Sequence, residues 1–408
     1  MSVKILYDAL DFWRRQKRNW KIVVTRQIFN RFFDRLTLGY TNIYIRQLGA
    51  SPLQLGSVNS ISGIASTLIA TPIGWLQDRY SLKRIITIGI GLFTVIPLIY
   101  ALAFDWIMVV PAVLITGLCL RIASCATICD LSLESKDRAT GKALCEVIGS
   151  TPSLLAPSVG AILITIFGGI SAEAIRPLFW IQFCARCLLF LFIATQLGEI
   201  TRIKKTRSRK SYIGDFREIF DHGTAIKRWI IFYFITTFTL GMITPFLEPF
   251  ANEIKGAGQL IIGGMTTAQV LTQVLFAAPL GRLADRIGRK KMFYLLTPLY
   301  AVSNLLLVLA PTDEFLVISA ILMGFRTITT VISIGAMIPE LVPSEYIGRW
   351  RGLIGLFYGL ANFTSPIIGG YVWENLSPNY VFLIPPVIDF FICIPLMYSI
   401  PETLKKNL

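Results

Sequence analysis

Long apolar runs alternate along the chain with short segments rich in charge, glycine or proline. Each run has about the 20 residues that a helix needs to cross a hydrocarbon core of about 30 Å. The pattern therefore predicts twelve membrane-spanning helices. They cover residues 22–46, 53–76, 83–104, 106–133, 142–168, 174–198, 228–251, 259–283, 290–310, 314–341, 348–374 and 378–400.

The composition agrees with a membrane protein. Hydrophobic residues make up 54% of the 408 positions and charged residues only 15%, and the mean hydropathy is +0.63. A water-soluble globule of this length could not bury so much apolar surface. We expect an all-α membrane protein.

Basic residues mark one side of the predicted topology. Most of the 39 Lys and Arg residues lie at the N-terminus, in alternate loops and at the C-terminus, whereas the other loops hold only Arg46, Arg176 and Lys255. Because cytoplasmic loops retain Lys and Arg, we expect both termini in the cytoplasm of a cell. The net charge of +15 then reflects topology and contact with anionic membrane lipid, and we expect no nucleic-acid partner.

Two loops share a charged pattern. "GWLQDRYSLKR" at 74–84 aligns with "GRLADRIGRKK" at 281–291. At nearly the same spacing, Thr37-Leu38-Gly39 recurs as Thr239-Leu240-Gly241, and Arg121 recurs as Arg326. A shared order and spacing indicates two related halves in parallel orientation.

The repeat sets the expected domain organisation. Six helices at 22–198 and six at 228–400 form two bundles, and a basic linker at 199–227 joins them. Residues 1–21 form a basic cytoplasmic segment and residues 401–408 a cytoplasmic tail.

The sequence resembles the major facilitator superfamily over nearly the whole chain. The two charged loops and the ending "SIPETLKK" carry this resemblance. The resemblance implies two six-helix bundles around a central cavity, working by alternating access. It also implies that the first, fourth, seventh and tenth helices line the path. Arg121 resembles the fourth-helix arginine of the family's proton-coupled members.

The repeated loops are interpreted as a gating latch. Their glycines permit close packing, and their aspartates can accept hydrogen bonds from neighbouring basic groups and helix N-termini. The candidate latch residues are Gly74, Asp78, Arg79, Gly281, Asp285 and Arg286, together with Asp130. The alternative is that these charges only set the topology.

A second repeated pair is "LLAPSVGA" at 154–161 and "FTSPIIGG" at 363–370. Pro157, Gly160, Pro366 and Gly369 form a candidate packing hinge that allows close approach and kinking between the halves. The first stretch imperfectly resembles the fifth-helix motif of family antiporters. Ordinary helix packing explains both stretches equally well.

Charged residues within the spans define the candidate binding site, because each is costly in a bilayer without a partner or water. On a helical wheel, the first span places Arg31, Asp34, Arg35 and Asn42 on one stripe. We expect substrate contacts from Arg31, Arg35, Arg121, Arg326 and Asn42. The excess of arginine favours an anionic or carboxylated solute.

Asp34 is the first candidate for proton coupling and Asp389 the second. Burial and a neighbouring arginine act oppositely on such an acid, so that substrate or conformation can tip its protonation. The competing hypothesis is that Asp34 forms a structural ion pair with Arg31 or Arg35, which lie three and one positions away on the same helix.

The sequence thus predicts a secondary transporter, acting as a monomer on a small organic solute with protons or another coupling ion. One alternative is a drug/proton antiporter that exports hydrophobic compounds. Another is a membrane sensor or lipid-moving scaffold without transport. We expect no enzyme, cofactor or metal, because the chain has one histidine, its seven cysteines all fall within predicted spans, and it has no P-loop.

Overall fold

The computed structural model describes residues 12–79, 82–122, 133, 138–198, 224–341 and 347–403, which contain helices and no strands. In the first half the elements are α2 (Arg18–Leu38), α3 (Thr41–Gln47), α4 (Pro52–Arg79), α5 (Leu82–Leu102), η1 (Trp106–Val109), α6 (Val110–Ile122), α8 (Arg138–Ser150), η2 (Pro152–Leu154), α9 (Ala156–Ile166) and α10 (Ala172–Gln196).

The second half repeats this layout. Its elements are α12 (Thr224–Ile243), η3 (Thr244–Phe246), α13 (Leu247–Glu253), α14 (Gln259–Ile287), α15 (Arg289–Leu309), α16 (Asp313–Thr329), η4 (Thr330–Ile334), α17 (Gly335–Glu340), α18 (Ile347–Asn375), α19 (Pro378–Ile388), η6 (Asp389–Cys393) and α20 (Ile394–Tyr398). As far as the structure describes it, each predicted span coincides with one helix or with consecutive helical pieces.

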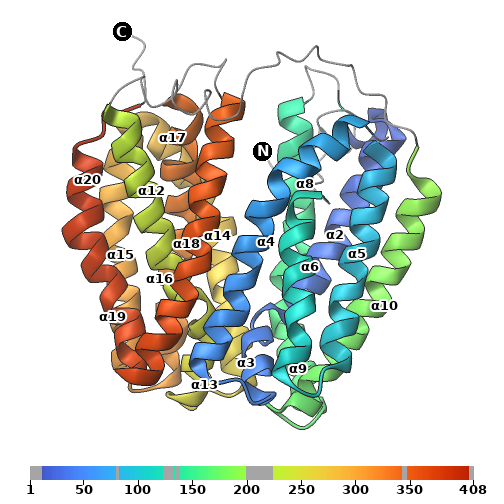
Figure 1. The fold of residues 1–408 in the computed structure, drawn as a ribbon, viewed down its shortest axis with the longest axis horizontal. Coiled ribbons are helices and arrows are strands. Elements are labelled where there is room, and N and C mark those ends of the chain that lie inside the picture. The colour runs from blue at the N-terminus through green and yellow to red at the C-terminus, as the bar shows by residue number, and fades with distance from the viewer. Residues whose placement is uncertain are drawn as a thin grey trace.

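Several of the predicted spans, including the first and the seventh, are divided into shorter helical pieces. The first span divides at Gly39 and Tyr40 into α2 and α3, and the seventh divides at Thr244 and Pro245. Proline lacks the backbone donor that a continuing α-helix needs, so η2 and η3 begin at or next to a proline. The two matching breaks place α3 and α13 at the same end of the molecule, on the lower side of Figure 1.

Nine helices within the described residues are long and apolar enough to cross a membrane. The predicted spans at 22–46, 53–76 and 106–133 are outside that group. The first carries Arg26, Arg31, Asp34 and Arg35, the second is rich in serine and threonine, and the third is described as helix only to Ile122. All three spans are nevertheless mainly helical in the residues that the structure describes.

The two halves form separate bundles, and two helix pairs make the most extensive contacts between them. α4 packs along α18, and α9 packs along α14. A methyl group on Gly56 would lie 2.1 Å from the Pro366 carbonyl oxygen, and one on Gly263 would lie 2.9 Å from the Pro157 carbonyl oxygen. Both contacts therefore bring backbone against backbone, which only glycine permits.

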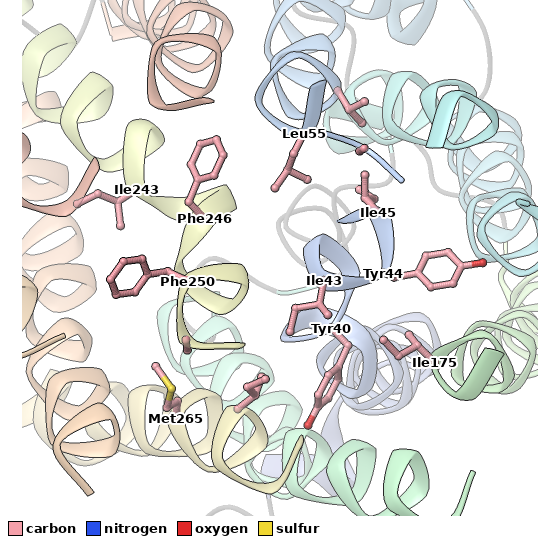
Figure 2. Packing of buried hydrophobic residues seen from close by; sticks show 14 of the residues in the cluster. Tyr40, Ile43, Tyr44, Ile45, Leu55, Ile175, Ile243, Phe246, Phe250 and Met265 are labelled. Carbon is pink, nitrogen blue, oxygen red and sulfur yellow. The ribbon is translucent and has the colours of Figure 1, made fainter. Parts of the chain in front are cut away.

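Hydrophobic packing differs between the two ends of the molecule. A single buried cluster joins both halves at the end formed by α3, α13 and the starts of α4 and α14, which we call the closed end. Figure 2 shows this cluster, with Tyr40, Ile43 and Leu55 on one side and Ile243, Phe246 and Phe250 on the other. Near the termini, at what we call the terminal end, the buried clusters belong to one half each.

Figure 1 shows the same arrangement, with the ribbons of the two halves approaching at the closed end and diverging toward the terminal end, where α2 begins and α20 ends. The halves are thus joined by one continuous apolar core at one end only.

Candidate functional site

The acid in the first helix pairs with a base from the sixth. Arg186 Nη2 on α10 lies 2.5 Å from Asp34 Oδ1 on α2. Asp34 also accepts hydrogen bonds from Gln182 Nε2 at 3.1 Å and from Asn30 Nδ2 at 2.7 Å. Asp34 therefore forms an ion pair between helices, in addition to its proximity to Arg35 on its own helix.

Arg186 is fixed from three sides. Its Nη1 donates to the Phe93 carbonyl oxygen at 2.6 Å, and its guanidinium lies 4.5 Å from the centre of the Phe93 ring. The Arg186 side chain is only 8% exposed, whereas the Asp34 side chain is 34% exposed. The carboxylate is therefore partly exposed while its basic partner is covered.

Two further arginines follow the same face of α2. Arg31 Nη1 donates to Ser150 Oγ on α8 at 2.5 Å. Arg35 is half-buried near Arg31 and Asp34, and it has no hydrogen bond or ion pair among the described residues. With Asp34 held by Arg186, this face keeps an excess of positive charge.

The second half contains its own buried ion pair. Arg326 Nη1 on α16 lies 3.4 Å from Asp389 Oδ2, and the two side chains are 1% and 2% exposed. Thr239 Oγ1 donates to Asp389 Oδ1 at 3.2 Å, and Arg326 Nη2 donates to the Thr236 carbonyl oxygen at 3.3 Å. The predicted substrate contact Arg326 thus lies inside its bundle, where helix packing covers it.

The two pairs occupy related positions. Arg186 and Asp389 both lie on the last span of their half, and Phe93 and Tyr300 both lie on the third. Each aromatic ring faces the arginine of its half, because Arg326 lies 4.7 Å from the centre of the Tyr300 ring. Arg186 was not identified from the sequence as the partner of Asp34.

The remaining predicted binding residues are placed separately. Asn42 accepts a hydrogen bond from Asn59 Nδ2 at 3.2 Å near the closed end. The backbone of Arg121 ends α6, but its side chain is outside the described part of the chain, as is Asp130 entirely. The structure therefore brings Arg31, Asp34 and Arg35 together and places Asn42 about two turns beyond them.

The predicted latch is described only in the second half, since the side chains of Gly74, Asp78 and Arg79 are outside the described part of the chain. Asp285 pairs with Arg289 Nη1 at 2.6 Å, and Arg289 Nη2 reaches Glu340 at 3.4 Å. Gly281 has open space around its Cα, and Arg286 is exposed. All these contacts stay within the second bundle.

The C-terminal segment completes that network. Glu402 accepts hydrogen bonds from the backbone nitrogens of Arg289 and Lys290, both at 3.1 Å, at the start of α15. Gly288, with φ of 109°, makes the turn before α15 and leaves room for the Glu402 carboxylate. An acid at a helix N-terminus is stabilising because it satisfies free backbone donors.

The predicted hinge divides into two kinds of contact. Pro157 and Pro366 lie between the halves, where their carbonyl oxygens face Gly263 and Gly56. Gly160 instead lies against the Leu36 carbonyl oxygen and Gly369 against that of Met242, each within its own half. The glycines of the two motifs therefore pack helices inside a bundle, in contrast to the expected packing between bundles.

Hydrogen bonds and an ion pair also join the two halves at the closed end. Arg46 donates through Nε and Nη2 to both oxygens of Glu253, at 2.7 and 2.8 Å. Glu374 Oε2 accepts from Ser51 Oγ at 2.9 Å and from the Leu53 backbone nitrogen at 3.0 Å. We call Arg46, Ser51, Glu253 and Glu374 the closed-end clamp, since two acids of the second half hold the α3–α4 connection of the first.

No group of three or more His, Cys, Asp or Glu side chains able to hold a metal ion occurs within the residues the structure describes.

Two bacterial resistance proteins are similar to parts of the chain. The chain is 25% identical over 183 residues to the tetracycline resistance protein, class B, of Escherichia coli, covering 44% of this chain and 45% of that protein. It is 25% identical over 257 residues to the multidrug resistance protein MdtG of Enterobacter lignolyticus, covering 60% and 57%. The chain thus spans about half the length of the curated relatives it matches.

Solved structures share the fold. The nucleoside transporter NupG superposes with a TM-score of 0.72 at 17% identity, covering 94% of this chain and 100% of that one. The human organic anion transporter MFSD10 (TETRAN) gives a TM-score of 0.63 at 16% identity, with coverage of 93% and 99%. The predicted fold of twelve helices in two parallel bundles is confirmed.

The family model of the Major Facilitator Superfamily matches residues 27–232 and again 229–408, one match for each half. With one match for each half and several helices long and apolar enough to cross a membrane, the chain is a multi-pass membrane protein, and it belongs to the major facilitator superfamily.

Proposed function

We propose that this transporter moves a small anionic or carboxylated organic solute by alternating access and couples the movement to protons at Asp34. The observation that carries the proposal is the ion pair between a partly exposed Asp34 and a covered Arg186, beside the arginine-rich face of α2.

Asp34 fits proton coupling better than Asp389 does. The Asp34 side chain is 34% exposed, so a proton can reach it, whereas Asp389 is 2% exposed and enclosed by its bundle. Protonating Asp34 would remove the negative charge that faces Arg186 and leave that arginine uncompensated. A helix contact that depends on one proton is a suitable element for linking protonation to conformation.

Arg35 supports the choice of an anionic solute. It is half-buried, and the nearby Asp34 carboxylate forms its ion pair with Arg186. A carboxylate or phosphate from the solute would add a negative charge and two hydrogen-bond acceptors in the planar geometry that a guanidinium prefers. Arg31, one helical turn away and anchored by Ser150, adds to the same field.

The packing of the two ends supports one access state. One apolar core and the closed-end clamp join the halves at one end, while the buried clusters at the terminal end remain separate. With both termini in the cytoplasm, as the basic loops predict, the solute would enter from the cytoplasmic side. The opposite state would require separation of Arg46 from Glu253.

The test is uptake into proteoliposomes holding wild type, Asp34→Asn or the control Asp313→Asn, an exposed acid at the closed end. The substrates are a panel of organic anions, cations and neutral amphiphiles, with and without a pH gradient. We expect anion uptake driven by the gradient, reduced at least tenfold in Asp34→Asn and unchanged in Asp313→Asn. Gradient-independent exchange should survive in Asp34→Asn, because exchange needs no net proton transfer.

Equal gradient-driven uptake by wild type and Asp34→Asn would contradict coupling at Asp34. Uptake restricted to cations would contradict the anionic solute. An Arg35→Gln variant separates these claims, since it should weaken anion binding while leaving the response to the gradient in place.

The drug/proton antiporter remains the second candidate, because curated relatives include resistance proteins for tetracycline and for multiple drugs. Phe29 on α2, which is 48% exposed, would then contribute to an aromatic surface for hydrophobic compounds. Binding of a lipophilic cation to the purified protein, unaffected by Arg35→Gln, would favour this candidate over the anion transporter.

A further inference from the structure

The interior of the second bundle contains buried polar atoms without a hydrogen-bond partner among the described residues. They are Tyr300 Oη, Asn304 Oδ1, Arg326 Nε, Arg326 Nη1 and Asp389 Oδ2. The side chains that carry them are between 0% and 1% exposed as whole residues. Native proteins rarely leave such groups unpaired, so each one requires an explanation.

These atoms converge on one place. Arg326 lies over the Tyr300 ring at 4.7 Å and 3.4 Å from Asp389. Asn304 follows Tyr300 by one turn of α15 and donates to its carbonyl oxygen at 2.8 Å. The Tyr300 side chain also lies near the Asn304 and Asp389 side chains, but its hydroxyl makes no hydrogen bond of normal geometry with them. Four side chains from α15, α16 and η6 therefore face one polar site inside the bundle.

The chemistry of the site selects its ligand. Arg326 offers two N–H donors, Asp389 and Asn304 offer acceptors, and Tyr300 can act as either. The charges of Arg326 and Asp389 cancel, so the site attracts neither a cation nor an anion strongly. Water is neutral, accepts from a guanidinium and donates to a carboxylate and an amide oxygen in the same position.

The backbone is irregular at the same place. The π-helical segment η6 begins at Asp389, and the π-helical segment η4 begins four residues after Arg326. A π-turn accommodates one extra residue, which redirects neighbouring side chains and is frequent at functional sites. Within the described residues the first half has 3₁₀ segments and no π segment. Both irregularities thus belong to the helices that carry the ion pair.

We propose that the second bundle encloses a water-binding site, in which one or two water molecules bridge Arg326 and Asp389 and are completed by Tyr300 and Asn304. The water links the ninth, tenth and twelfth spans and lets a charged pair persist inside the bilayer. This inference concerns the interior of one bundle and does not depend on the transported solute.

The decisive variant is Tyr300→Phe, which removes one hydroxyl and keeps the ring that Arg326 faces. If the hydroxyl binds water, its loss lowers the midpoint of thermal unfolding by about 1–3 °C. If the hydroxyl is unpaired, its loss relieves a buried polar group and the midpoint rises or stays the same. A lower midpoint shows that the hydroxyl is bonded in the folded protein, and a midpoint at or above that of wild type shows that it is not.

The matched control is Tyr44→Phe, since the Tyr44 hydroxyl donates to the carbonyl oxygens of Tyr100 at 2.8 Å and of Ala103 at 3.2 Å. Both variants are measured in the full-length purified protein by intrinsic tryptophan fluorescence during heating. We expect shifts of the same sign and similar size. A Tyr300→Phe midpoint at or above that of wild type overturns the proposal.

A second measurement separates water from a bound ion. Wild type and Tyr300→Phe are heated in sodium chloride, in choline chloride and in sodium gluconate at equal ionic strength. A difference between the two proteins that is the same in all three salts supports water. A difference that disappears when sodium or chloride is withdrawn identifies that ion as the ligand and overturns the proposal.

Discussion

Each half contains an ion pair between an arginine and an aspartate, but the last span supplies the base in one half and the acid in the other. In the first half the last span supplies the base, Arg186, and the first span supplies the acid, Asp34. In the second half the last span supplies the acid, Asp389, and the tenth span supplies the base, Arg326. What the halves share is an arginine–aspartate ion pair whose arginine faces an aromatic ring of the third span, Phe93 or Tyr300.

The pairs also differ in access to solvent. Asp34 is partly exposed and accepts hydrogen bonds from two amides, whereas Arg326 and Asp389 are covered by their own bundle. Removing one charge of a covered pair leaves the other charge buried and uncompensated, which costs more than the same loss in a partly exposed pair. The comparison therefore indicates a structural role for the second pair, while the first pair belongs to the proposed coupling site.

The largest effect is expected from breaking the covered pair. Arg326→Ala leaves Asp389 charged and unpaired inside the bundle, which should destabilise the protein by about 3–5 kcal/mol. The measurement is thermal unfolding, together with the monodispersity of the purified protein. A double variant, Arg326→Met with Asp389→Leu, should recover most of the loss, because it removes both charges. A single variant as stable as wild type would contradict the structural role.

A smaller effect is expected in the first half. Asp34→Ala leaves Arg186 with its hydrogen bond to the Phe93 carbonyl oxygen and its contact with the Phe93 ring, and the site reaches solvent. We expect a loss of about 1–3 kcal/mol in the free energy of unfolding. Thermal unfolding of this variant beside Arg326→Ala gives the ranking directly. If Asp34→Ala proved the more damaging of the two, the assignment of roles would be reversed.

The smallest effect concerns the contact between the halves. Glu253→Gln removes the charge facing Arg46 in a partly exposed pair, worth up to about 1 kcal/mol. Because the pair joins the bundles, its loss should shift the protein away from the closed arrangement about fivefold without unfolding it. Oxidative cross-linking of Ser158→Cys with Thr267→Cys, whose hydroxyls lie 2.9 Å apart across the halves, measures this population.

The control for the clamp is Asp313→Asn in the same cysteine background, an exposed acid at the same end. It should leave the cross-linking rate unchanged. A Glu253→Gln rate equal to that of the control would show that the apolar core alone keeps this end closed.

The fold could be predicted from the sequence to a large extent, because span length and hydropathy are local properties. The breaks at Gly39 and Pro245 and the duplication of the glycine-rich motifs carry direct sequence signals. The π-helical segments η4 and η6 were not predicted, because span length and hydropathy do not distinguish a π-turn from an α-turn.

The site was harder to predict for a physical reason. Periodicity places Arg31, Asp34 and Arg35 on one face of a helix, but it does not say which other helix supplies the partner. Arg186 lies far away in the sequence and becomes a neighbour only after α2 and α10 pack together. The clamp residues Arg46 and Glu253 were missed for the same reason, since each looks like an ordinary loop charge.

The shared apolar core at the closed end has a consequence for how the chain could be made. Because that core and the α4–α18 and α9–α14 contacts join the halves without help from the peptide connection, covalent continuity between them is dispensable for recognition. Two polypeptides, each encoding one bundle and produced in the same cell, would therefore carry complementary surfaces sufficient to find one another and reconstitute a whole molecule.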